Sequence, residues 1–109
     1  MKMQNNWKPV IESLFAELER NNIIIDEVYN GEEDGEKDRS KMVEEATACD
    51  ECNVYVRLPG ESKRHTLFIV LGNEPFETVA DHSDHPVLEY ILSAWSDELE
   101  GTPCPQIEA

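Results

Sequence analysis

The sequence predicts an α+β domain of two layers, in which a mainly antiparallel sheet of three to four strands carries the N- and C-terminal amphipathic helices on one face. Three observations indicate this fold. Each end of the chain has one apolar stripe at helical spacing, the middle has short β-branched or alternating segments, and short turns separate these segments. Strands joined by short turns pair antiparallel, and single-stripe helices cover one face of a sheet.

The length of 109 residues is that of one domain whose core needs no disulfides. We expect a single domain over 1–109, with a core at about 6–101, a flexible acidic loop at 31–40 and a loose tail at 102–109. Three cysteines without a framework spacing favour a reducing compartment, and no apolar run reaches the length of a signal peptide or membrane span. The expected location is therefore cytoplasmic.

The first predicted element is a helix that starts after Asn5 or Asn6 and ends in "RNN" at 20–22. Counted from Trp7, its apolar residues fall at 0, +3, +4, +7, +8 and +11, which is one stripe. Next, "IIIDEVY" at 23–29 is short and β-branched, so it predicts a strand.

The acidic loop "GEEDGEKDRS" follows, with two glycines and no apolar residue. After it, Ser40 is expected to cap a short helix that turns Met42, Val43 and Ala46 inward.

Two further strands are expected to form a hairpin. Apolar residues alternate in "NVYVRL" at 53–58, whereas "HTLFIVL" at 65–71 is continuously apolar, as in a central strand or one covered on both faces. "FETVAD" at 76–81 predicts a short edge strand. The last helix has apolar positions 0, +3, +4, +7 and +11 from Leu88; Ser83 or Asp84 caps it and Gly101 ends it.

Charge is the most unusual property of the chain. Twenty-four Asp and Glu against nine Lys and Arg give a formal net charge of −15. Nine acidic residues follow Arg64, but no Lys or Arg does. Affinity for nucleic-acid phosphates and for anionic membranes depends on basic side chains. We therefore expect neither nucleic acid nor membrane as a direct partner.

A protein with a basic surface is the expected partner. Two groups of carboxylates are predicted to bind it, one in the loop and one at the end of the last helix: Glu32, Glu33, Asp34, Glu36, Asp38, Asp97, Glu98 and Glu100. Opposite potentials accelerate encounter and favour one orientation. Because such a basic surface normally holds nucleic acid, the protein would act by charge mimicry. Solubility alone is the alternative explanation of the acidic surface, and the oligomeric state is left open.

The cysteine pair of "CDEC" is the candidate for a metal site. Cys49 and Cys52 have a zinc-ligand spacing, and His82 and His85 form a second pair, so the alternative function is a zinc-stabilised structural domain. However, His82 is expected at the turn end of the hairpin, a strand length from Cys52. Acids between the sulfurs oppose thiolate formation and hence redox chemistry. The favoured interpretation is a helix-to-strand corner, and no metal or cofactor is expected.

Catalysis and calcium binding are disfavoured as well. On a calcium-loop template that starts at Asn30, Lys41 stands where a bidentate glutamate is required. "HSDH" is too local for a catalytic triad, and the chain has no nucleophile elbow, P-loop or dinucleotide motif. The enzymatic alternative is a pair of His65 and His82 at one end of the sheet, joined by a carboxylate. We predict a protein that is not an enzyme.

The run "HTLFIVLGNEPFETVADHSDHPVLEYILSAW", with "MVEEATACDECNVYVRLP" before it, resembles the C-terminal half of small acidic phage and prophage proteins of unknown function. In these, a strand ending in "VLGNEP" leads through "ADYS" into a final helix. The resemblance covers about residues 40–97. It implies a mobile-element origin and an accessory role, and it supplies no active site. "ADHSDH" departs from the pattern where a tyrosine is expected.

Overall fold

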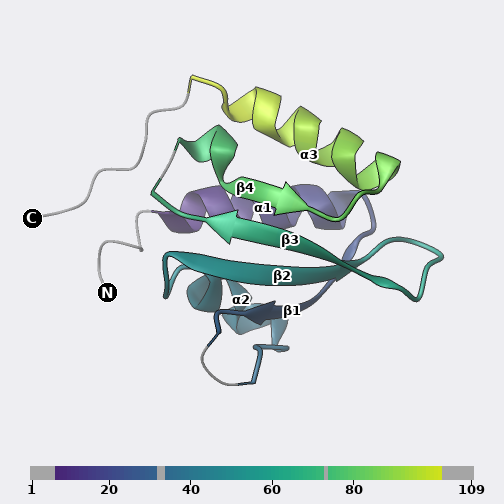
Figure 1. Cartoon of the computed structure of the whole chain (residues 1–109), viewed down its shortest axis with the longest axis horizontal. Coiled ribbons are helices and arrows are strands. Elements are labelled where there is room, and N and C mark those ends of the chain that lie inside the picture. The colour runs from purple at the N-terminus through teal and green to yellow at the C-terminus, as the bar shows by residue number, and fades with distance from the viewer. Residues whose placement is uncertain (1–6, 32–33, 73, 102–109) are drawn as a thin grey trace, which may run out of the picture.

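A four-stranded antiparallel sheet is the centre of the fold in the computed structural model, which describes residues 7–31, 34–72 and 74–101 (Figure 1). The strands lie in the order β1-β2-β3-β4. The elements follow along the chain as α1 (Lys8–Arg20), β1 (Ile24–Tyr29), α2 (Arg39–Ala46), β2 (Glu51–Arg57), β3 (Arg64–Val70), η2 (Pro75–Glu77), β4 (Val79–His82) and α3 (Pro86–Leu99). The predicted α+β class is confirmed. Among the described helices, none has the length and apolar character needed to cross a bilayer.

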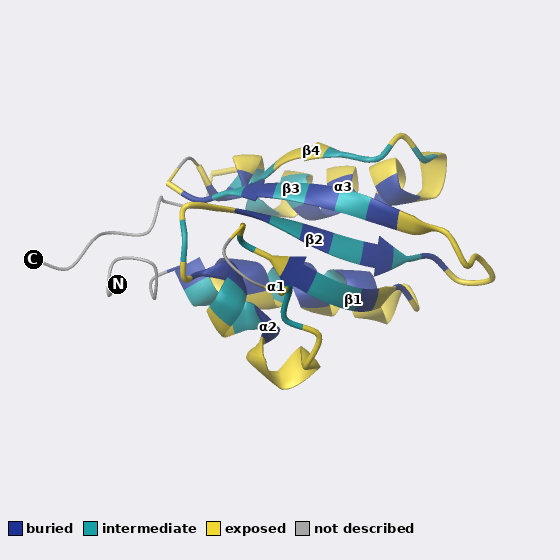
Figure 2. Ribbon diagram, turned by 60° about the horizontal axis from the view of Figure 1, so that its bottom comes forward, coloured by how far each residue is buried: buried dark blue, intermediate teal, exposed yellow. Residues whose placement is uncertain are grey.

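One face of the sheet is buried against the helices and the other is open. Buried and half-buried residues alternate along β2 and β3 (Figure 2). Core-facing residues of these two strands are Cys52, Val54, Val56, His65, Leu67 and Ile69. The predicted central position of β3 is confirmed, since it pairs with β2 and β4. It is not covered on both faces, because Thr66, Phe68 and Val70 stay partly exposed on the open side.

The two terminal helices bury the predicted apolar stripes. The buried residues of α1 and α3 are Val10, Ile11, Leu14, Phe15 and Leu18, and Leu88, Ile91, Leu92 and Trp95. Between the helices, the indole Nε1 of Trp95 donates a hydrogen bond to Ser13 Oγ at 2.7 Å. The short helix α2 buries Met42 and Ala46 beside β1, as expected.

Two helix caps differ from the prediction. The carboxylate of Asp38, rather than the hydroxyl of Ser40, caps α2, because it accepts a hydrogen bond from the Ser40 N–H at 3.0 Å. His85 caps α3 through Nδ1, which accepts from Val87 N at 3.2 Å. Ser83 is unavailable as a cap, since its Oγ accepts from Thr66 N on β3. A third difference is at α1, where the N-cap position is Trp7, which makes no side-chain cap hydrogen bond, and not Asn5 or Asn6, which lie outside the described residues.

The acidic loop folds back onto β1. Val28 and Glu36 exchange two backbone hydrogen bonds of 2.9 and 2.7 Å, which form an isolated antiparallel bridge.

The predicted strand at 76–81 is divided: Pro75–Glu77 is a 3₁₀ turn, and the edge strand is only Val79–His82. Thr78 stabilises this turn by donating its hydroxyl to the Pro75 carbonyl at 2.8 Å. The predicted loose tail at 102–109 lies outside the described residues.

The Ser13–Trp95 hydrogen bond should couple α1 to α3. Ser13→Ala leaves the N–H of the buried Trp95 indole without its acceptor, so we expect the free energy of unfolding to fall by about 1–3 kcal/mol. In a Trp95→Phe background the same substitution should cost much less, because no indole N–H remains. Urea unfolding of the four chains measures this double-mutant cycle. Equal costs in both backgrounds would show that the bond does not contribute.

Candidate functional site

The carboxylates predicted to bind a partner lie in two separate regions. Asp34, Glu36 and Asp38 belong to the loop between β1 and α2, at one edge of the molecule (Figure 1). Asp97, Glu98 and Glu100 are exposed at the C-terminal end of α3, near the opposite edge (Figure 1). The structure therefore does not bring the two predicted groups together. Glu32 and Glu33 lie outside the described residues.

The carboxylates of the loop are engaged in holding the loop itself. Asp38 accepts from both the hydroxyl and the N–H of Ser40, at 2.8 and 3.0 Å, and these bonds lower the pKa of Asp38. Glu36 accepts from the N–H of Asp38 at 3.0 Å. Three basic residues, Lys37, Arg39 and Lys41, alternate with these acids. The negative field of the loop is thus partly compensated.

The α3 end of the molecule, in contrast, has acidic residues without neighbouring Lys or Arg in sequence. We define the α3 acidic surface as the exposed residues Glu74, Glu77, Asp97, Glu98 and Glu100. The 3₁₀ turn packs on α3, where Ser96 donates its hydroxyl to the Phe76 carbonyl at 2.9 Å. Glu74 and Glu77 were missed by sequence reasoning because this contact joins segments 20 residues apart. The only sequence signal for an acidic surface in this region was the absence of Lys and Arg after Arg64.

A shallow groove of about 220 Å³ lies between the 3₁₀ turn, β4 and α3. Its lining includes Phe76, Val79, Leu92, Trp95 and Asp97. The lining is mixed, with His82, Ser93 and Ser96 as further polar residues. Apolar surface beside a carboxylate suits a lysine or arginine side chain, because such side chains lay their aliphatic stems on apolar surface and keep the charged head in a polar setting. The groove could therefore hold one basic side chain of a partner, in addition to the attraction by the charge of the α3 acidic surface.

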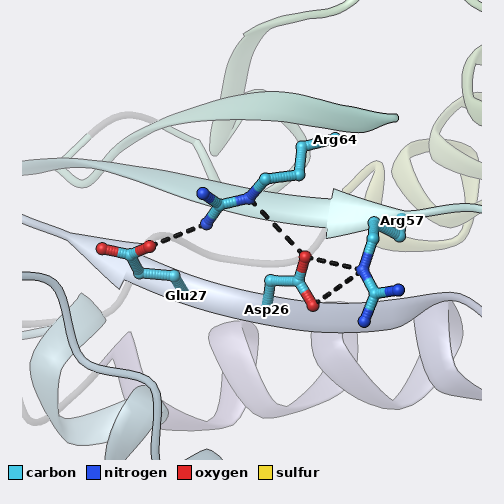
Figure 3. A network of polar contacts seen from close by, with 4 residues as sticks. All are labelled: Asp26, Glu27, Arg57 and Arg64. Atoms are coloured by element: carbon cyan, nitrogen blue, oxygen red, sulfur yellow. Dashed lines mark hydrogen bonds and ion pairs between the residues drawn. The ribbon is translucent and has the colours of Figure 1, made fainter. Parts of the chain in front are cut away.

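Arg57 and Arg64 are paired with carboxylates on the open face of the sheet (Figure 3). Arg57 Nε lies 2.8 Å from Asp26 Oδ2, and Arg64 Nη2 lies 2.7 Å from Glu27 Oε1. Arg64 also covers the ring of Tyr55, with its guanidinium carbon 4.6 Å from the ring centroid. The pairing of β1 with β2 shifts at Asp26, between Ile25 and Glu27. These pairs hold two of the nine basic residues on the sheet, away from α3.

A cluster of one carboxylate and two imidazoles lies where the hairpin turns. Glu61 Oε1 is 3.0 Å from His65 Nε2, and Glu61 Oε2 is 3.0 Å from His85 Nε2. The two rings meet edge to face with centroids 5.1 Å apart. The hydrogen bonds to His65 and His85 lower the pKa of Glu61. We call these three residues the histidine cluster.

The predicted pairing of His65 with His82 is wrong, although the expectation of histidines at one end of the sheet is correct. In the β3–β4 register His82 lies opposite Leu67, and its Nδ1 is 2.9 Å from the Ser83 carbonyl oxygen. The chain runs on antiparallel to β3, so His85, rather than His82, reaches the level of His65. Glu61 was missed because nothing in the local sequence relates it to His85.

Cys49 and Cys52 do not join the histidines; Cys104 lies outside the described residues. Within the described ranges, the histidine cluster is the only group of three or more potential ligands close enough to share an ion. A zinc site made of Cys49, Cys52, His82 and His85 therefore has no support in the geometry. Cys52 is buried at the start of β2, opposite Ile69, and burial raises the pKa of its thiol to about 12, with smaller contributions from Cys49 and Glu45. The helix-to-strand corner is confirmed.

No family model matches the chain, and no curated protein or solved structure matches it at a significant level. The function must therefore be inferred from its own residues.

Cys52 should resist alkylation in the folded protein. The thiolate is the reacting species, and at pH 8 a thiol with a pKa of about 12 is almost entirely protonated as well as buried. Cys49, which is partly exposed, should react with iodoacetamide at least about tenfold faster. Peptide mapping by mass spectrometry after partial labelling gives the ratio. In urea the ratio should approach one, and equal rates in the folded chain would contradict the burial of Cys52.

Proposed function

We propose that this protein is a non-enzymatic interaction module that binds a basic protein surface through the α3 acidic surface. The observation that carries the proposal is the separation of charge: exposed carboxylates gather around η2 and the end of α3, whereas no Lys or Arg follows Arg64. A one-signed field of this kind orients an approaching partner and accelerates encounter.

The groove beside α3 supports a specific contact in addition to the long-range field. A basic side chain of the partner would lie along the partly exposed Phe76 and Val79 with its charged head near Asp97. Binding would then depend on a few desolvated contacts, which give affinity, and on the surrounding carboxylates, which give orientation. The loop carboxylates have a secondary role, because Asp38 and Glu36 are already engaged within the loop.

The partner in this proposal is a nucleic-acid-binding protein of the host cytoplasm. Its basic surface normally holds phosphates, so occupation by carboxylates would inhibit it by charge mimicry. An accessory role of this kind is also what the sequence resemblance to small acidic phage and prophage proteins implies.

The position of the charge, not only its amount, should decide binding. Neutralising Glu74, Glu77, Asp97 and Glu98 to their amides removes four negative charges from the α3 acidic surface. The matched control neutralises Glu12, Glu44, Asp50 and Glu51, which are also exposed and lie outside both predicted binding groups, and removes the same number of charges. Both chains and the unmodified protein are immobilised and exposed to bacterial host lysate. We expect the first variant to lose its captured partner by about tenfold or more and the control to retain it.

Salt and competing nucleic acid provide the second readout. Raising the salt from about 50 to about 300 mM should strongly weaken the captured complex, because exposed charges are screened at that ionic strength. Double-stranded DNA added to the lysate should compete if the partner surface is a nucleic-acid site. A partner that is insensitive to salt, or that is lost equally from both four-fold variants, would overturn the proposal. A salt-sensitive partner that DNA does not displace would overturn the mimicry.

A further inference from the structure

The histidine cluster has the donor set of a metal site rather than that of a surface ion pair. Its three side chains come from three parts of the fold: Glu61 lies in the β2–β3 turn, His65 at the start of β3, and His85 at the N-cap position of α3. One oxygen or nitrogen atom of each side chain lies within 4.8 Å of those of the other two. Such convergence from separate elements requires the folded sheet, and it leaves the three ligand atoms close together.

We propose that Glu61, His65 and His85 bind a divalent transition-metal ion of the zinc class. Two imidazole nitrogens and one carboxylate oxygen are a set that Zn²⁺ accepts in tetrahedral sites with water as the fourth ligand. Mg²⁺ and Ca²⁺ prefer oxygen ligands, so the two nitrogens select against them. In a tetrahedral site, ligand atoms about 2.1 Å from the ion lie about 3.4 Å apart, so ligand atoms that now lie within 4.8 Å of one another must approach by at most about 1.4 Å, through movement of the more exposed side chains.

The burial of the cluster is graded in a way that suits this role. The His65 side chain is only 6% exposed, which holds one ligand in place, whereas the side chains of His85 and Glu61 are 19% and 37% exposed. The ion would therefore rest against the protein on one side and keep a position open to water on the other. Negative charge on the whole chain, formally −15, attracts a cation to this position.

The cap of α3 links metal binding to the start of that helix. Because Nδ1 of His85 accepts a hydrogen bond from Val87 N, the neutral ring carries its proton on Nε2 and donates it to Glu61. Coordination through Nε2 needs the other tautomer, with the proton on Nδ1, so the bond from Val87 must open. Metal binding thus competes with the helix-cap hydrogen bond from Val87, and this competition lowers the affinity for the metal. The NMR signal of the Val87 amide should therefore change when the metal binds.

The test is a titration of the full chain with ZnCl₂, followed by calorimetry and by NMR. The chain carries Cys49→Ser and Cys104→Ser, so that neither of these thiols can be a ligand. We expect one-to-one binding in the micromolar range and no saturable binding of MgCl₂. The protein has three histidines, and His82 is an internal control. Zinc should shift the ring resonances of His65 and His85 and the Val87 amide, and leave the His82 ring unchanged.

Two variants separate coordination from structural support. Glu61→Gln removes the carboxylate, and His85→Asn removes the imidazole but keeps a side-chain oxygen able to cap α3. Each should weaken zinc binding by at least about tenfold, while His82→Asn should not. A dissociation constant weaker than about 100 µM in the parent chain, binding that survives both variants, or zinc shifts centred on His82 would overturn the proposal. CoCl₂ gives an independent check, because nitrogen and oxygen ligands produce visible bands without the near-ultraviolet absorption of thiolate.

Discussion

The register between β2 and β3 sets the position of most other parts of the molecule. Val54 lies opposite Leu67 and Val56 opposite His65, so the same face of both strands is buried beneath the helices. A slip of one residue would turn every one of these side chains toward the open face. The helices α1 and α3 cover this face together and are joined by the Trp95–Ser13 hydrogen bond. The open face stays half-exposed and carries the paired arginines.

The same register explains why a histidine lies on the core-facing side of the sheet. His65 occupies a buried position at the hairpin end of β3, where a polar ring needs a hydrogen-bond partner. Glu61 supplies that partner from the turn four residues earlier, and it also contacts His85 at the start of α3. The histidine cluster therefore forms only when β3 and the start of α3 are packed together in the folded core.

Charge is distributed by the same architecture. Up to Arg64, basic residues pair with acids that lie close in space: Arg39 Nε lies 2.8 Å from Glu19, and Arg57 and Arg64 contact Asp26 and Glu27. Residues after Arg64 have no Lys or Arg to provide such pairs. The molecule thus has a partly neutralised side at β1 and α2 and a more negative side at α3. A partner with a basic surface would meet the α3 side first.

The amino-acid sequence by itself determined the three α-helices and the approximate positions of the four strands, because periodic apolar residues report locally which side of a segment is buried; it did not separate the 3₁₀ turn at Pro75–Glu77 from the edge strand. It also placed Asp97, Glu98 and Glu100 on a helix end. Tertiary structure alone decided that His85 caps α3, that Glu61 bridges two histidines, and that Glu74 and Glu77 lie beside α3. These facts depend on strand register and on the angle at which the chain enters a helix, and neither is encoded in the periodicity of one segment.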